Sequence, residues 1–363
     1  MAGDRVLRLI AAGDVMLGDS SHFLGRGVAA RIRRHGPQYP WAEVAELIGV
    51  GDVFLANLES PLSAIAGGNS WERVYRGTPD AAAGLRRAKR SIVTLANNHI
   101  LEHGSWVLAE TKAILESQGV AWAGYDSAGG PGDAVLEWRQ DGLECSLIAE
   151  SLIPDITGRT ISADSVEHRL IEHLRSTSAE IRIVSLHWGD EYSAHPSAGQ
   201  RRLGRLLVEA GATLVIGHHP HVLQPIESVG DGLVAYSLGN FVFDQDWTRQ
   251  TRCGGLLDVT LGATGVKEWR FVPTVSDARC QPRPATDGVA AWAAARIAAS
   301  GPLSNDEYFR QLTAARRHHR ISMKTELLRH LPRVGTDTWR FLATKRRRPR
   351  PHLDAQVGPE GRA

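Results

Sequence analysis

The chain has 363 residues, of which 42% are apolar, and a formal net charge of +2. This length and composition predict a globular protein with a sizeable core. No apolar run reaches the roughly 18 residues that a membrane-spanning helix needs. The N-terminus lacks the apolar core and cleavage site of a signal peptide, so a cytoplasmic location is expected. Three scattered cysteines exclude a disulfide framework and a thiolate metal site.

Charge is distributed unevenly along the chain. Residues 316–350 contain twelve Arg or Lys and two acids, which gives this segment +10 and leaves −8 for the rest. We expect this segment either to be held against the acidic body or to attract an anionic polymer and, weakly, an anionic membrane surface. Nucleic acid is not an expected partner, because few aromatic residues lie between the basic ones.

Six β-rich apolar segments end in polar side chains. In chain order they are residues 5–12, 52–59, 91–99, 181–189, 212–221 and 233–241. Helical patterns over residues 104–119 and 197–211 lie between them, and residues 136–150 predict a hairpin that turns at Asp141-Gly142. The alternation of strands and helices predicts an α/β fold with some parallel pairing.

The pattern changes to helices after about residue 275. We expect a main domain over residues 1–285, a helical appendage over residues 286–345, and a basic, disordered tail over residues 346–363. His318 and His319 lie in a basic helical pattern, which predicts a solvated face for both.

Polar side chains at the ends of the strands predict one shared site, because sites in α/β sheets form beyond the carboxyl ends of strands. Carboxylates, amides and imidazoles are ligands for divalent ions. The spacing of His219 and His221 would place both rings on one side of an extended segment, whereas His218 is expected to pack or to form a hydrogen bond. Each candidate alone could equally cap a turn or pack in the core. The candidates are Asp14, Asn57, Glu59, Asn98, His99, His187, His219 and His221.

Six motifs in order resemble a known family, and no nucleophile elbow, phosphate-binding loop or dinucleotide motif competes with them. The motifs are AAGDVML, FLANLESPLS, TLANNHILEHG, SLHWGDEY, GHHPHVLQPIE and YSLGNFVFD. Over about residues 7–275 the chain resembles the CapA-like poly-γ-glutamate capsule biosynthesis proteins. That family is similar to the calcineurin-like metallophosphoesterases, which implies a four-layer α/β/β/α sandwich with a C-terminal helical appendage here.

The resemblance also implies roles for individual residues. Asn98 and His99 would be catalytic, and Glu191, Tyr192 and Asn240 would contact substrate. Met16 stands where metallophosphoesterases have a His, which would weaken one metal position, and Glu102 stands where this family usually has an Asp. One or two divalent ions (Mn, Fe, Zn or Mg) would be held by Asp14, Asn57, Glu59, Asn98, His187, His219 and His221.

Three functions stay open at this stage. The first is a metal-dependent hydrolase that cleaves a phosphoester or a γ-glutamyl amide with a metal-activated water, while His99 protonates the leaving group. The second is an accessory protein that binds metal or polymer and supports a synthase or ligase partner, which the missing His at position 16 favours. The third is a soluble enzyme that tailors a peptide or metabolite.

Overall fold

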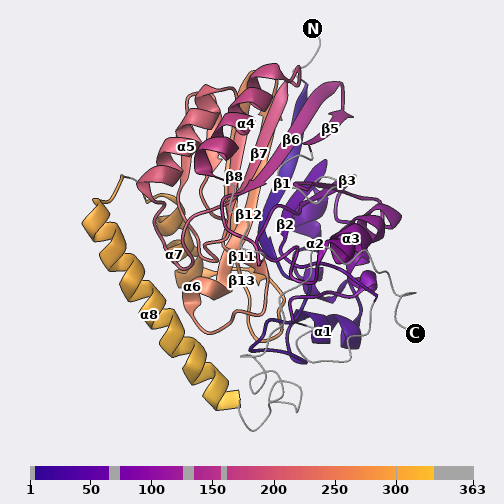
Figure 1. Cartoon of the computed structure of the whole chain (residues 1–363), viewed down its shortest axis with the longest axis vertical. Coiled ribbons are helices and arrows are strands. Elements are labelled where there is room, and N and C mark those ends of the chain that lie inside the picture. Colours follow the sequence, from indigo (N-terminus) through magenta and orange to yellow (C-terminus); the bar gives the residue numbers. More distant parts are fainter. Residues whose placement is uncertain (1–4, 65–73, 126–134, 157–161, 300, 331–363) are drawn as a thin grey trace.

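The computed structural model describes residues 5–64, 74–125, 135–156, 162–299 and 301–330. Over these ranges the chain forms two mixed β-sheets flanked by helices (Figure 1). None of the helices in the described ranges is both long and apolar enough to cross a membrane. The tail predicted over residues 346–363 lies outside the described residues.

The larger sheet has eight strands in the order β14-β13-β12-β1-β2-β3-β4, and β11 pairs with β1 beyond this path. β1 runs parallel to β2 and antiparallel to β12, so it joins a parallel half to an antiparallel half. The strands are β1 (Val6–Val15), β2 (Val53–Leu58), β3 (Arg90–Thr94), β4 (Val120–Ala123), β11 (Asn240–Val242), β12 (Cys253–Gly262), β13 (Gly265–Val275) and β14 (Arg283–Pro284).

The smaller sheet has six strands in the order β5-β6-β7-β8-β10-β9. Its four central strands are parallel, and β5 and β9 pair antiparallel at the two edges. The strands are β5 (Val135–Gln140), β6 (Leu143–Ser151), β7 (Ile181–His187), β8 (Leu214–His218), β9 (Ile226–Val229) and β10 (Gly232–Ala235).

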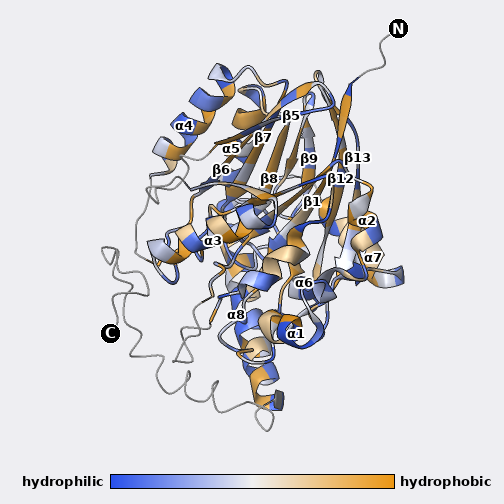
Figure 2. Cartoon of the chain, turned by 90° about the vertical axis from the view of Figure 1, so that its right-hand side faces the viewer, coloured by the Kyte–Doolittle hydropathy of each residue, from blue (hydrophilic) through white to orange (hydrophobic). Residues whose placement is uncertain are grey.

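Alternation along the strands explains the layers. On β7, Ile183 belongs to the main core together with Leu55 of the larger sheet, whereas its neighbour Val184 belongs to a second cluster with Leu170 and Leu207 of the helices outside. The sheets therefore stack face to face, with α4 and α5 on one outer face (Figure 1). Figure 2 shows apolar residues along the strands and hydrophilic residues on the outward side of α4.

The helices complete the layers. α4 begins with a Ser162 cap and α5 with a Ser197–Gln200 capping box, so the sequence fixes both starts locally. The helices are α1 (Val28–His35), α2 (Ala45–Gly49), α3 (Ser105–Ser117), α4 (Ala163–Ser176), α5 (Ala198–Glu209), α6 (Arg249–Arg252), α7 (Asp287–Ile297) and α8 (Asn305–His330). Two 3-10 helices, η1 (Tyr39–Trp41) and η3 (Pro79–Leu85), lie beside the larger sheet.

The predicted α/β fold is confirmed, as are the hairpin at Asp141-Gly142 and the two helices after residue 275. Residues 233–241 are not one strand, however. The segment leaves the smaller sheet after β10, turns at Gly239 (φ 69°) and joins β1 of the larger sheet as β11. A single apolar run thus connects the two sheets beside the strand ends.

The two helical segments at the C-terminus differ in their contacts. α7 packs Ala293 and Ile297 into the main core. α8 runs along the outside of the molecule (Figure 1). The expectation of a solvated face holds for His318 but is wrong for His319, which is 3% exposed and stacks on Tyr192 with ring centroids 4.3 Å apart. The basic composition of α8 gave no sign in the sequence that one side of this helix is buried.

Candidate metal centre

Asp14 is placed at the end of β1 by close backbone packing. A Cβ atom at Gly13 would lie 1.9 Å from the carbonyl oxygen of Gly239, so only glycine permits this approach. The approach brings Asp14 opposite Asn57 on one side and Asn240 on the other. The register shifts at Asp14, and such a bulge redirects side chains next to functional sites.

Glu59 follows β2 directly and lies at the centre of the cluster. Its side chain is fully buried, and neither carboxylate oxygen has a hydrogen-bond partner. Three imidazole nitrogens surround Oε1: Nε2 of His221 at 3.6 Å, of His187 at 3.8 Å and of His99 at 3.9 Å. A buried carboxylate without donors is unfavourable unless a cation joins the site.

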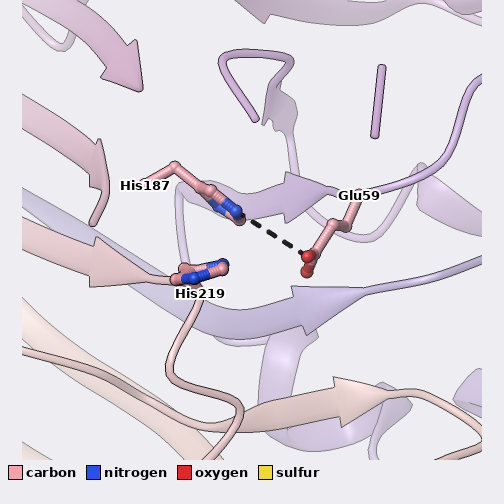
Figure 3. Close-up of side chains that lie close together, drawn as sticks. All are labelled: Glu59, His187 and His219. Carbon is pink, nitrogen blue, oxygen red and sulfur yellow. Dashed lines mark ion pairs between the residues drawn. The ribbon is translucent and has the colours of Figure 1, made fainter. Parts of the chain in front are cut away.

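The first group of possible ligands is Glu59, His187 and His219, whose ligand atoms lie within 4.8 Å of one another. His187 is the last residue of β7 and His219 follows β8, the neighbouring parallel strand, so both rings reach Glu59 from the same sheet edge (Figure 3). Nε2 of His187 also lies 2.8 Å from Oδ1 of Asn98. The group thus offers a carboxylate, two imidazoles and an amide oxygen.

The second group is Asp14, Glu59 and His221, again within 4.8 Å. Nδ1 of His221 lies 2.9 Å from Oδ1 of Asn240 and 3.3 Å from Oδ2 of Asp14, both acceptors, so this nitrogen carries a hydrogen. Nε2, which faces Glu59, is then the ligand atom. Met16 is buried two residues after Asp14, and it gives this group no imidazole.

His219 and His221 do not lie on an extended strand, so that expectation was wrong. β8 ends at His218, and both residues adopt left-handed backbone angles, with φ of 95° and 58°. Such angles are costly outside glycine and concentrate at functional sites. The turn places the centroids of the two rings 5.9 Å apart and directs the rings to different groups of possible ligands.

The electrostatics of the two groups differ. Burial lowers the pKa of His187 well below its usual value and that of His219 to about 3, so both rings are neutral. Burial also acts to lower the pKa of His221, but the carboxylates of Glu59 and Asp14 raise it to about 10. Burial raises the pKa of Glu59 well above its usual range.

Asp14 is held as a carboxylate by its hydrogen bonds. Burial acts to raise its pKa, but His218 and His221 bring the pKa well below the usual value. His218 Nδ1 donates to Oδ1 at 3.0 Å, and the Asn57 amide donates to the same oxygen at 3.0 Å. His218 therefore forms a hydrogen bond, as expected from the sequence.

Two amides in the cluster contact other side chains. Asn57 donates to Asp14 through Nδ2, and its Oδ1 accepts from Asn97 at 3.1 Å. Asn240 holds Nδ1 of His221 and donates to the carbonyl of Thr251 at 3.0 Å. The geometry gives both amides a positioning contact. Asn97, fully buried, was not among the candidates, although it lies in the same strand-end motif.

His99 borders the cluster and is partly open to solvent. Its Nδ1 lies 3.0 Å from Oε1 of Glu102, and its Nε2 points toward Glu59. Tyr75 lies against its face, with ring centroids 4.5 Å apart. A carboxylate on one nitrogen fixes the ring and leaves the other nitrogen for proton transfer. The longer Glu102 side chain thus makes the contact from its place three residues after His99.

The residues after β7 form the neighbouring wall. The backbone N–H of Tyr192 donates to the carbonyl of Pro220 at 2.8 Å, and its ring lies 6.4 Å from that of His221. Asp190 accepts from Tyr308 at 2.8 Å and from Arg316 at 2.7 Å, both on α8. The charge of Glu191 acts on both Glu59 and His221, which places this carboxylate near the cluster.

The residues present fit a divalent ion. Besides both oxygens of Glu59, buried His218 Nε2 and His219 Nδ1 have no hydrogen-bond partner. Ligands about 2.0–2.2 Å from one ion lie roughly 3–4 Å from each other, which matches the 3.6–3.9 Å spacings around Glu59. Nitrogen and oxygen donors without thiolates suit Zn²⁺, Mn²⁺ and Fe²⁺.

Two stacked mixed sheets flanked by helices define a metallophosphoesterase-like fold. A solved phosphatase from Mycoplasma pneumoniae has this fold: it matches with a TM-score of 0.50 and 11% identity, over 76% of this chain and 96% of that chain. Residues 8–245 match the family described as bacterial capsule synthesis protein PGA_cap. The chain therefore belongs to the PGA_cap capsule synthesis family, as the six motifs predicted.

Two relatives share most of their length with this chain. The capsule biosynthesis protein CapA of Bacillus anthracis is 27% identical over 307 residues, which cover 78% of this chain and 70% of the relative. The PGA biosynthesis protein CapA of Bacillus subtilis is 29% identical over 292 residues, covering 74% and 72%. The similarity extends beyond the residues that form the cluster.

Proposed function

We propose that this capsule-family chain is a metal-dependent hydrolase that cleaves a phosphoester or a γ-glutamyl amide, with the γ-glutamyl amide as the favoured substrate class. The observation that carries the proposal is Glu59, buried without a donor and surrounded by three imidazole nitrogens. The names of the two CapA relatives, which concern capsule and PGA biosynthesis, support the substrate class.

The chain's own residues divide the work. Glu59, His187, His219 and Asn98 would hold one divalent ion, and Asp14, Glu59 and His221 would hold another. A bound ion polarises the scissile group and lowers the pKa of water. His99, oriented by Glu102, delivers a proton to the leaving group from its Nε2. Tyr192 and Glu191 face the substrate.

The experiment supplies purified protein with Mn²⁺ and measures cleavage of three substrates: poly-γ-glutamate, short γ-glutamyl peptides and a bis-aryl phosphodiester. Cleavage of the polymer that disappears in Glu59→Gln and His99→Gln supports the proposal. Cleavage of the phosphodiester alone would replace the amide with a phosphoester. Release of product only from short peptides would support a tailoring enzyme instead.

A non-catalytic accessory role is the second candidate, and Met16 favours it because a ligand is missing from one group. The contact between His99 and Glu102 opposes it, because a scaffold has no need of an oriented imidazole at the edge of the cluster. Metal binding without cleavage of any of the three substrates would favour the accessory role.

A further inference from the structure

A cavity lies beside α1, and none of the candidate metal ligands lines it. Its volume is about 640 Å³, within the range of small-molecule sites. The walls come from residues 23–26, from α1, from the segment after β11 and from the segment between β13 and β14. Its charged residues are Arg26, Arg31, Arg33, Arg34, Asp244 and Asp246.

The arginines give the cavity a cationic wall. Arg33 and Arg34 are exposed, while Arg26 and Arg31 are half-buried. Arg31 donates from Nη2 to the carbonyl of Ala278 at 3.0 Å, but its buried Nε has no partner. Guanidinium groups match the geometry of carboxylates and bind them in pairs of hydrogen bonds. The wall therefore suits a ligand with several carboxylates.

Asp244 adds an acceptor of opposite charge. It is 2% exposed, and its Oδ2 accepts from the backbone N–H of Ser20 at 2.8 Å. Its Oδ1 is buried and has no hydrogen-bond partner. Burial raises the pKa of Asp244 to about 7, and the nearby charge of Asp19 acts in the same direction. A cationic donor from a ligand would satisfy this carboxylate.

The residues around Asp244 do not favour a divalent ion as this donor. Among the described residues, the groups that gather three possible ligand atoms within 4.8 Å do not include Asp19, Asp244 or Asp246. Four guanidinium groups beside Asp244 would also repel a small dication. A single ammonium on a molecule that carries carboxylates fits both the arginines and the aspartate.

The cavity adjoins the metal centre along the chain. Asn240, which holds His221, precedes Asp244 by four residues, a span of at most about 14 Å. Phe243 lies between them, and its ring packs 5.1 Å from the ring of His221. The cavity wall at Asp244 is therefore connected to the metal centre by a short stretch of chain that includes this ring.

We propose that this cavity binds the amino-terminal end of a γ-glutamyl peptide. The free ammonium of the end residue would donate to Oδ1 of Asp244, while its α-carboxylate and a carboxylate of the next residue would pair with Arg31 and Arg34. Each unit of such a peptide carries a carboxylate beside the chain, which matches several arginines at once. The identity of the peptide rests on the proposed function, whereas the charge pattern does not.

The test is calorimetric binding of γ-glutamylglutamate to the metal-loaded full chain, beside its N-acetyl derivative, which lacks the ammonium. The parent dipeptide should bind more tightly. Asp244→Asn should weaken it by about tenfold or more and abolish its advantage over the acetylated form. Arg34→Gln should weaken both by about two- to fivefold, while exposed Arg86→Gln, outside the cavity, should change neither.

Two results would overturn the proposal. One is equal binding of the parent and acetylated dipeptides. The other is binding that is lost in Glu59→Gln yet unchanged in Asp244→Asn and Arg34→Gln, because the dipeptide would then occupy the metal centre. Binding with the expected pattern but no hydrolysis of any substrate would support the cavity and contradict the proposed function. Melting curves of each variant verify that it folds.

Discussion

The two groups of possible ligands share Glu59 but differ in what a metal ion must displace. In the Glu59–His187–His219 group, burial keeps both imidazoles neutral, so neither ring carries a positive charge that a metal ion must displace. In the Asp14–Glu59–His221 group, the pKa of His221 is raised to about 10, so a metal must first remove a proton.

The hydrogen bonds also indicate that the Asp14–Glu59–His221 group would bind a metal ion less readily. Asp14 already accepts from Asn57, His218 and the backbone N–H of His219. Met16 adds no imidazole to its group, whereas Asn98 adds an oxygen to the other. The two groups therefore share one carboxylate but would offer a metal ion unequal sets of ligands.

The largest expected effect follows from removing the shared residue. Glu59→Gln removes the carboxylate that both groups share, so the affinity for both ions should fall. The fall should exceed the ~10–100-fold loss that follows removal of an outer contact. Metal analysis after dialysis should find almost no ion, and hydrolysis should be lost. Exposed Glu209→Gln on α5 is the control, and unchanged metal content in Glu59→Gln would refute the shared role.

Substitution of His99 should lower turnover without changing the metal content. His99→Gln removes the proton donor, so kcat should fall by about 10²–10⁴ while metal content stays the same. The measurement is steady-state kinetics together with metal analysis of the same preparation. His35→Gln, on α1, is the matched control. Loss of metal in His99→Gln would mean that this ring is a ligand rather than a proton donor.

Met16→His should narrow the difference in metal affinity between the two groups of ligands. A new imidazole beside Asp14 should strengthen the weaker position by about tenfold or more, since it adds one ligand bond. A metal titration monitored by calorimetry measures the change in affinity. Met16→Leu preserves volume and should leave both affinities as they are. Equal affinities in wild type and Met16→His would show that position 16 does not face the second group.

The smallest effect concerns α8. His319→Ala removes the stack on Tyr192, which should lower the free energy of unfolding by about 0.5–1.5 kcal/mol. Urea unfolding measures this loss, and exposed His318→Ala on the same helix should change stability by less than about 0.5 kcal/mol. Equal effects of the two substitutions would mean that α8 does not support the wall beside the cluster.

Much of the fold and of the cluster could be predicted because both follow from local rules. Neighbouring parallel strands bring their carboxyl ends to one edge, so His187 and His219 could be expected to lie together from the sequence alone. Ser197 and Gln200, which form a capping box, likewise predict the start of α5 from the sequence. The cap depends on residues close together in the sequence, and the rule for strand ends applies without knowing which distant segment completes the site.

The features that escaped prediction depend on contacts between distant segments. The break between β10 and β11 is set by packing of Gly13 against Gly239, and neither residue indicates its partner. The left-handed turn at His219 arises where Asp14 accepts its backbone N–H. The burial of His319 requires Tyr192, more than a hundred residues earlier.

Metal titration of the chelator-treated full chain with Mn²⁺ tests the central claim most directly. Because one group is neutral and the other protonated and short of a ligand, we expect two binding events whose dissociation constants differ by at least about tenfold. One ion per chain should remain after dialysis, and His187→Ala should remove it while His221→Ala leaves it. Two equally tight ions, or none, would contradict the account.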